Sequence, residues 1–186
     1  MNKDFIYIKD NFFSKKECNS FIKLFNKQLT KESINKGNYS FKDLFYKGFV
    51  YDEKFMSIFQ NKFYVEIEKY KKLYPEINMT ASFWGVDSLR FKKFNIGESF
   101  SNYHSEHSMS SLNRILNIQI YLSKHNCGTE FYRSKEVILS EVGRLAIFPA
   151  YFTHTHKGQV CPNKKERFIV TGYISFIKPG NFENVS

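Results

Sequence analysis

The chain has 186 residues, of which 42% are hydrophobic and 18% are aromatic, and its formal net charge is +10 at pH 7. This length is typical of one globular domain, which buries roughly 70% of its unfolded surface, so a substantial core is expected. No stretch approaches the roughly 20 apolar residues of a membrane span, and the first residues lack the pattern of a signal peptide. We therefore expect a cytoplasmic protein without a membrane partner.

The positive charge is only a weak argument for a nucleic-acid partner. The chain has 23 lysines but five arginines, and the lysines are scattered along it. Arginine is the residue usually favoured for phosphates and base edges, so this composition predicts a solvated surface. Nucleic acid is disfavoured as a partner, although the charge alone leaves it open.

The three cysteines, Cys18, Cys127 and Cys161, are widely spaced and form no CxxC motif. Neither a zinc knuckle nor a redox pair is suggested by this spacing. The odd count and the absence of a signal peptide predict an intracellular protein with reduced thiols.

Two helices are expected in the first half of the chain. Ser14 is followed three residues later by Glu17, which is the pattern of an N-terminal capping box. Apolar residues at helical spacing then follow in two segments separated by a polar, glycine-containing stretch. The elements expected before residue 80 are a strand over 5–8, a helix over 15–28, a loop over 29–50 and a helix over 53–73.

After residue 80 the apolar runs become short, β-branched and aromatic, with turn residues between them. Many short strands of this kind indicate a β-sandwich or barrel, so the fold class is α+β, with two helices packed against an antiparallel β core. A ligand site is expected in the mouth of the barrel. The expected strands are 88–94, 99–104, 112–122, 129–132, 137–138, 144–149, 154–157 and 168–177.

A metal-binding pattern occurs at His104 and Glu106. On a strand, residues i and i+2 point to the same face, so both side chains would reach one ion. A distant histidine, His154 or His156, would complete the two-histidine, one-carboxylate set that holds Fe(II) with one face open. Alternatives remain, because a lone His-x-Glu is common by chance, and His107 with His104 would suit a zinc-dependent hydrolase.

Several segments, in order, resemble the 2-oxoglutarate- and Fe(II)-dependent dioxygenases of the prolyl-4-hydroxylase-like type. Small bacterial and phage members of that group use His-x-Glu in place of the commoner His-x-Asp. The resemblance covers most of the chain and is ordered from residue 88 to 177. The matching segments are 97–106, 120–122 with 128–131, 143–149 with 152–158, and 167–173.

This resemblance implies a fold and a set of cofactors. The fold would be a single domain over 1–186, in which residues 1–80 form a helical N-terminal support. Residues 81–178 would form a double-stranded β-helix, the jelly-roll or cupin-like core, with the N-terminal helices packed on one face. The cofactors would be Fe(II) and 2-oxoglutarate, and ascorbate is a further candidate.

The resemblance also implies the iron ligands. His104 and Glu106 would be the first two. His156 is favoured as the third because it lies eleven residues before Arg167, close to the usual gap of about ten, whereas His154 fits better when counted forward from Pro149. The histidine that is not a ligand would line the pocket, and no catalytic side chain beyond the metal ligands is expected.

Cosubstrate contacts follow from the same resemblance. Arg167 would pair with the distal carboxylate of 2-oxoglutarate, for which a planar guanidinium that stays charged is well suited. Thr171 is a second candidate contact. Many relatives have a tyrosine where this chain has Phe94, so Tyr103 or Tyr121 is expected to replace that phenolic contact.

The implied reaction is hydroxylation of an unactivated C–H bond. The substrate would be a prolyl or other side chain in a peptide, or a small molecule, which is an analogy from the fold alone. Two alternatives remain open at this point: a non-catalytic jelly-roll binding module, and an oxidative demethylase that acts on nucleic acid.

Overall fold

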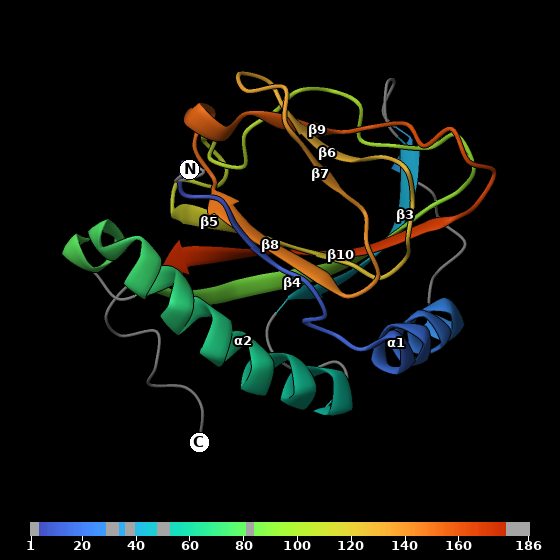
Figure 1. Cartoon of the computed structure of the whole chain (residues 1–186), viewed down its shortest axis with the longest axis horizontal. Coiled ribbons are helices and arrows are strands. Elements are labelled where there is room, and N and C mark those ends of the chain that lie inside the picture. Colours follow the sequence, from blue (N-terminus) through green and yellow to red (C-terminus); the bar gives the residue numbers. More distant parts are fainter. Residues whose placement is uncertain (1–3, 29–33, 36–39, 48–52, 81–83, 178–186) are drawn as a thin grey trace.

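The computed structural model describes residues 4–28, 34–35, 40–47, 53–80 and 84–177. It contains a helical layer, a large antiparallel sheet and a small antiparallel sheet, stacked in that order (Figure 1). None of the described helices has the length and apolar character needed to span a membrane. The elements are β1 (Tyr7–Lys9), α1 (Lys15–Gln28), β2 (Ile34–Asn35), β3 (Ser40–Lys47), α2 (Glu53–Leu73), the 3-10 helix η1 (Pro75–Met79), β4 (Trp84–Phe94), β5 (Arg114–Tyr121), β6 (Gly128–Phe131), β7 (Val137–Leu139), β8 (Arg144–Pro149), η2 (Phe152–His154), β9 (His156–Gly158) and β10 (Arg167–Phe176).

The large sheet has seven strands in the order β1-β8-β5-β10-β4-β3-β2, and the small sheet has the order β7-β6-β9. Neighbouring strands pair antiparallel throughout both sheets. The mixed α+β class expected from the sequence is therefore confirmed. The strands β1, β2 and β3 show that the first 80 residues supply part of the sheet as well as the helices.

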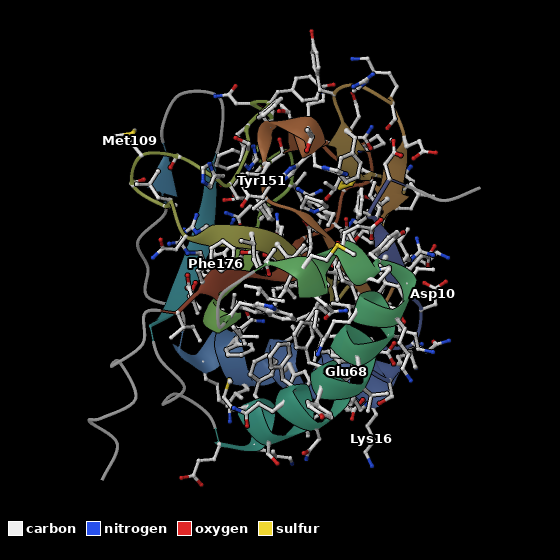
Figure 2. The ribbon with its side chains drawn as sticks, turned by 90° about the vertical axis from the view of Figure 1, so that its left-hand side faces the viewer. Asp10, Lys16, Glu68, Met109, Tyr151 and Phe176 are labelled. Carbon is white, nitrogen blue, oxygen red and sulfur yellow. A yellow bond between two sulfur atoms is a disulfide. The ribbon has the colours of Figure 1, made fainter. Side chains whose placement is uncertain are left out.

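Both helices cover the same face of the large sheet. Ser14 Oγ accepts a hydrogen bond from the Glu17 amide (3.2 Å), and Glu17 Oε2 accepts one from the Ser14 amide (2.7 Å), so the predicted capping box starts α1. The main core lies between the helices and the sheet and is rich in stacked phenylalanines, whereas Lys16 projects from the outer surface of α1 (Figure 2). The two helices expected over 15–28 and 53–73 are confirmed at those bounds.

Strand alternation divides the side chains of β5 between two environments. Leu116, Ile118 and Ile120 belong to the core beneath the helices. Asn117, Gln119 and Tyr121 alternate with them and face the small sheet instead, because successive side chains in a strand point to opposite faces. A second, smaller core fills part of that space between the sheets. The polar residues of the candidate site lie on this same face.

Two expectations about secondary structure are wrong. Residues 29–50 were expected to form a loop, yet β2 and β3 lie within them, and β3 pairs with β4 over six residues; the remaining positions of that stretch, 29–33, 36–39 and 48–50, lie outside the described residues. Backbone pairing with β4, rather than an alternating apolar pattern, defines this strand. Residues 99–104 were expected to form a strand and contain only isolated bridge residues, such as His104, which pairs with His156.

The expectation of reduced thiols is also wrong for two of the three cysteines. Cys127 and Cys161 form a disulfide across a sequence separation of 34, while Cys18 is free and buried. The pairing of β6 with β9 carries the two cysteines together, since Thr129 lies opposite Gly158 in the register. Their Cα atoms are 5.1 Å apart, a separation that sequence spacing alone does not reveal.

Candidate metal centre

Backbone hydrogen bonds bring a histidine, a glutamate and a second histidine together. The amides of His104 and His156 each donate to the other's carbonyl at 2.9 Å, which fixes the segment around His104 against β9. The amide of Glu106 donates to the carbonyl of Ala150 at 3.0 Å. Two segments about fifty residues apart therefore place three side chains at one point between the sheets.

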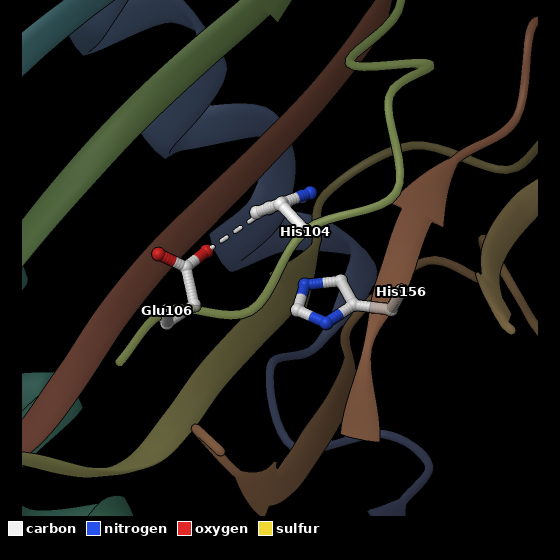
Figure 3. A group of neighbouring side chains, drawn as sticks. All are labelled: His104, Glu106 and His156. Atoms are coloured by element: carbon white, nitrogen blue, oxygen red, sulfur yellow. Dashed lines mark ion pairs between the residues drawn. The ribbon is translucent and has the colours of Figure 1, made fainter. Parts of the chain in front are cut away.

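These three side chains form a cluster that could hold a metal ion. One potential ligand atom from each of His104, Glu106 and His156 lies within 4.8 Å of the other two, and the described residues contain no second cluster of this kind. His104 Nε2 is 3.3 Å from Glu106 Oε1 (Figure 3). His104 and Glu106 reach this arrangement from an irregular segment, so the i, i+2 strand geometry expected from the sequence is not what aligns them.

Hydrogen bonds on the far side of each imidazole orient the ring and select its tautomer. His104 Nδ1 is 3.0 Å from the carbonyl of Asn102, and His156 Nδ1 is 2.9 Å from the carbonyl of His154. A carbonyl can only accept, so both Nδ1 atoms carry the proton. The Nε2 lone pairs are then free to bind a cation, which is the arrangement found around most histidine metal ligands.

The protonation states also suit a cation. Burial raises the pKa of Glu106, but the adjacent His104 ring and the charge of Lys92 outweigh burial and lower the pKa to about 2. Burial, followed by repulsion from His104, lowers the pKa of His156 to about 4. At neutral pH the site therefore presents an ionised carboxylate and a neutral imidazole, the forms that bind metals.

The second oxygen of Glu106 has its own support. Arg114 Nη1 lies 3.4 Å from Glu106 Oε2 and 3.4 Å from the Glu106 carbonyl oxygen. The guanidinium stacks on the ring of Tyr173 at 3.6 Å, and burial together with the nearby Glu106 raises the pKa of that phenol. Arg114 and Tyr173 therefore hold the carboxylate in one orientation.

Aromatic rings enclose the histidines. The ring of Phe100 is centred 4.2 Å from that of His104, and the ring of Phe148 is 5.0 Å from that of His156. Phe131 lies 6.0 Å from His156 and stacks edge-on against Phe148. This shell fixes the ring positions and lowers the local dielectric, which strengthens interactions with a bound ion.

A polar pocket extends from the cluster between the two sheets. It is lined by His104, Glu106 and His156 at one part and by residues of β4, β5 and β10 at another. Three buried polar atoms of this lining have no hydrogen-bond partner among the described residues: Asn117 Oδ1, Arg167 Nε and Thr171 Oγ1. Buried polar atoms are rarely left unpaired, so these atoms point to a missing polar ligand.

Arg167 is the cation of this pocket that the sequence analysis singled out. It is only 4% exposed, and its guanidinium lies 4.5 Å from the ring of Phe94. Nη1 donates to the carbonyl of Gln159 (3.1 Å) and approaches Cys127 Sγ (3.5 Å). Burial lowers the pKa of Arg167 to about 10, since no carboxylate among the described residues pairs with it.

Other residues proposed from the sequence lie elsewhere. Tyr121 does not line this pocket. Its hydroxyl donates to Thr129 Oγ1 at 2.7 Å and lies 3.2 Å from the carbonyl oxygen of Ile138. His154 Nε2 is 2.6 Å from the carbonyl of Asp4, so this ring is bound to the N-terminal segment and not to the cluster. His107 Nε2 is 3.0 Å from the carbonyl of Leu112, which removes it from the zinc arrangement considered above.

Several residues of the site were missed in the sequence. Lys92 and Asn117 line the pocket, and Arg114 supports Glu106. Asn117 carried a detectable signal, because Asn117 and Gln119 are polar residues two positions apart in an otherwise apolar strand and therefore point to the same face. Lys92 carried none, since it resembles the many surface lysines until its 8% exposure is seen.

Comparisons with known proteins agree with this architecture. No protein-family model matches the chain, and no curated protein matches it in sequence. Solved structures do match: the viral collagen prolyl hydroxylase of Paramecium Bursaria Chlorella virus-1, in its 2OG complex, has a TM-score of 0.69 at 15% identity and covers 95% of this chain and 98% of its own.

Two further structures extend this likeness. A Trichoplax adhaerens prolyl hydroxylase in complex with a peptide fragment of the hypoxia inducible factor oxygen degradation domain has a TM-score of 0.68 at 12% identity, with coverage of 94% of this chain and 84% of its own. An oxidoreductase of the 2OG-Fe(II) oxygenase family from Burkholderia pseudomallei has a TM-score of 0.64 at 10% identity, with coverage of 93% and 86%. The chain therefore has the fold of the prolyl-4-hydroxylase-like 2-oxoglutarate- and Fe(II)-dependent oxygenases.

Proposed function

We propose that the chain is a 2-oxoglutarate- and Fe(II)-dependent dioxygenase that hydroxylates an unactivated C–H bond. The observation that carries this proposal is the pocket that joins a His-Glu-His cluster to a buried arginine without a carboxylate partner among the described residues. A divalent cation at one end and a guanidinium at the other are the two contacts that a 2-oxo dicarboxylate needs. The fold shared with 2OG-Fe(II) oxygenases supports the same assignment.

Iron fits the donor set. His104, Glu106 and His156 would hold it through two nitrogens and one carboxylate oxygen, the set typical of non-haem Fe(II) oxygenases that keep positions open. Arg114 and Tyr173 would keep the carboxylate oriented. A zinc-dependent hydrolase is disfavoured because His107 is hydrogen-bonded to the backbone, away from the cluster.

The cosubstrate fits the charge and hydrogen-bonding capacity of the pocket. Arg167 would bind the distal carboxylate, and Thr171 Oγ1 would donate a further hydrogen bond; both lack a partner at one polar atom. Lys92 and Arg167 outnumber the single anion Glu106, so the lining favours an anionic ligand. When both are bound, Fe(II) and 2-oxoglutarate would supply the oxidising power for hydroxylation, with succinate and carbon dioxide as the other products.

Entry of the cosubstrate requires a side chain to move. The cavity measures ≈ 30 Å³ in this structure, which is room for about one water molecule. Lys92 is the lining residue best able to shift, because its ammonium is carried on a flexible four-carbon stem. We propose that its displacement opens the pocket while the charges of Lys92 and Arg167 attract the dicarboxylate.

A peptide is the substrate class that the surface beside the cluster favours. The rings of Tyr103 and Tyr132 meet edge-on at 4.9 Å, and Lys135 and Lys157 each lie 4.5 Å from one of these rings. Aromatic surfaces of this kind bind extended, proline-containing chains. Lys135 would favour acidic neighbours, whereas Lys157 is already paired with Glu130 at 3.6 Å. The peptide fragment held by the Trichoplax neighbour is consistent with a prolyl or other side chain as the target.

The remaining expectations belong to the same proposal. We interpret the two facing sheets as the double-stranded β-helix of these enzymes, formed within a single domain over 1–186. Ascorbate as an additional cofactor and a cytoplasmic location stay predictions. A small-molecule substrate and a nucleic-acid substrate remain alternatives to a peptide, and a non-catalytic binding module remains the alternative to an enzyme.

The decisive experiment measures succinate formed from 2-oxoglutarate by purified protein loaded with Fe(II), first without and then with a panel of prolyl peptides. We expect slow turnover alone, faster turnover with a substrate peptide, and none in Glu106→Gln. That substitution keeps the shape of the side chain but removes the anionic ligand. Glu136→Gln is the matched control, because the Glu136 side chain is exposed and does not line the pocket of the cluster.

The outcomes separate the alternatives. Turnover in Glu106→Gln equal to that of the wild type would refute the proposed site. Tight metal binding without any succinate would instead indicate a binding module that keeps the fold. Stimulation by oligonucleotides but not by peptides would assign the nucleic-acid alternative.

A further inference from the structure

We infer that the Cys127–Cys161 disulfide is a redox-responsive latch that sets how firmly Arg167 holds a dicarboxylate. The inference rests on the proposed function, because it assigns Arg167 to the cosubstrate. It goes further by making cosubstrate affinity depend on the oxidation state of a cysteine pair that lies outside the metal cluster.

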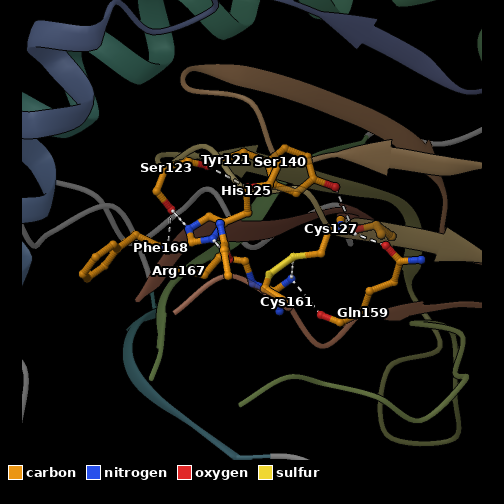
Figure 4. The surroundings of a disulfide bond; sticks show 12 residues. Tyr121, Ser123, His125, Cys127, Ser140, Gln159, Cys161, Arg167 and Phe168 are labelled. Carbon is orange, nitrogen blue, oxygen red and sulfur yellow. Dashed lines mark hydrogen bonds between the residues drawn. A yellow bond between two sulfur atoms is a disulfide. The ribbon is translucent and has the colours of Figure 1, made fainter. Parts of the chain in front are cut away.

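The disulfide touches the arginine directly. Arg167 Nη1 lies 3.5 Å from Cys127 Sγ and donates to the carbonyl of Gln159 at 3.1 Å, and Cys161 follows Gln159 by two residues (Figure 4). One guanidinium nitrogen therefore contacts both sides of the link, the start of β6 and the segment that leaves β9. Its position depends on these two segments staying together.

The segment that the disulfide anchors has few backbone hydrogen bonds to the rest of the fold. It runs over residues 159–166, between β9 and β10, and so connects His156 to Arg167. The Gln159 amide donates to the Gly128 carbonyl at 2.9 Å; beyond it, the next backbone bond is a local one, from Lys165 to Asn163 at 2.9 Å. Side-chain contacts from Gln159 to Glu130, from Asn163 to His125 and from Glu166 to Lys93 supplement these bonds. The disulfide adds the covalent restraint on the residues that precede Arg167.

A thiol can reach the link from one side. Cys127 is only 2% exposed, whereas Cys161 is partly exposed. A low-molecular-weight thiolate would attack the Cys161 sulfur, forming a mixed disulfide there as the S–S bond breaks and the electron pair leaves on Cys127. The guanidinium of Arg167 beside Cys127 stabilises this leaving thiolate.

The complete exchange balances. A second thiolate attacks the mixed disulfide and releases Cys161, so the protein gains two electrons and two protons, and two small thiols become one small disulfide. Oxidation by a small disulfide runs the same steps in reverse. In the reduced protein, the Cys127 sulfur is an anion or a thiol beside Nη1, and it competes with a dicarboxylate for the same guanidinium.

The test compares 2-oxoglutarate binding to the oxidised and the dithiothreitol-reduced protein by calorimetry. Mn(II) replaces Fe(II) so that the metal exchanges no electrons with the thiols. We expect reduction to weaken binding about tenfold, the loss associated with about one charge-assisted hydrogen bond, while Mn(II) affinity stays the same. Amide hydrogen exchange over residues 159–166 should quicken on reduction even without ligand.

Variants separate the parts of this inference. Cys127→Ser/Cys161→Ser should bind 2-oxoglutarate weakly under both conditions, and Cys18→Ala, whose thiol lies in α1, should keep the full redox response. Oxidised glutathione should add to Cys161 in Cys127→Ser, as detected by mass spectrometry. These readouts do not depend on catalytic turnover.

Equal 2-oxoglutarate affinity in the oxidised and reduced protein would overturn the latch while leaving the proposed function intact. Absence of 2-oxoglutarate binding in both states would overturn the proposed function, and the latch with it. Unchanged hydrogen exchange over residues 159–166 would show that the disulfide does not restrain the segment, and would likewise reject the inference.

Discussion

Replacing Arg167 by methionine should have opposite effects on ligand binding and on the stability of the ligand-free protein. Methionine preserves much of the volume of the side chain but removes its charge. The arginine is 4% exposed and lacks a carboxylate partner among the described residues, so its charge is unfavourable until an anion binds. A residue retained for packing alone would not show this combination.

The magnitudes follow from the contacts of the guanidinium. Its pKa falls from 12.5 to about 10 on folding, so the unfolded chain holds the proton more tightly, and the charge costs the folded state about 3 kcal/mol at neutral pH. The hydrogen bond to the Gln159 carbonyl offsets about 2 kcal/mol of this cost. Arg167→Met should therefore raise the unfolding free energy by about 1 kcal/mol.

Binding should change in the other direction. A guanidinium and a carboxylate about 4 Å apart attract each other by roughly 4 kcal/mol at an effective dielectric constant of about 20, and desolvation of the carboxylate reduces this gain. We expect Arg167→Met to lose about 3 kcal/mol of 2-oxoglutarate binding, which is about a hundredfold increase in Kd.

Urea denaturation of the metal-free protein measures the first effect, and calorimetry of the Mn(II)-loaded protein measures the second. Arg133→Met is the matched control, because Arg133 is exposed on the turn after β6 and should change neither quantity. Wild-type affinity for 2-oxoglutarate in Arg167→Met, or a loss of more than about 2 kcal/mol in stability with unchanged affinity, would refute this reasoning.

Three further predictions concern protonation and packing. Acidifying the metal-free protein from pH 6.5 to about 4 should lower its unfolding free energy by about 3 kcal/mol. In this range the unfolded chain binds a proton at His156, whereas the folded protein does not, because folding lowers the pKa of His156 to about 4. Urea denaturation at several pH values checks this, and a flat profile would contradict it. Gly143→Ala should lower the unfolding free energy by more than about 2 kcal/mol, since φ is +75° and the new Cβ would lie 1.8 Å from the carbonyl oxygen of Phe13. The control Gly97→Ala, at φ +80° with no other atom of the described residues within 4 Å, should lower it by only about 1 kcal/mol; thermal or urea denaturation measures both. Tyr121→Phe should lose about 1 kcal/mol of stability through its hydrogen bond to Thr129 and leave the Kd for 2-oxoglutarate unchanged; a tenfold weaker Kd would restore its expected role in the pocket.

The two helices could be predicted from the sequence because residues close together in the chain determine where a helix begins and ends. The capping residues at Ser14 and Glu17 and the apolar spacing of 15–28 and 53–73 are short-range signals, and both helices form at those bounds. The expected strand over 99–104 and loop over 29–50 were wrong because pairing partners far along the chain decide which segments become strands.

The sequence by itself determined the α+β class and the residue types of the candidate site, because helix periodicity, strand alternation and the His-x-Glu spacing are properties of neighbouring positions. Only the tertiary structure decided which histidine joins His104 and Glu106. The isolated bridge between His104 and His156 turns one ring inward, while His154 bonds to the N-terminal segment instead. The same pairing of distant strands joins Cys127 to Cys161, since contacts across a sheet depend on register and not on sequence spacing.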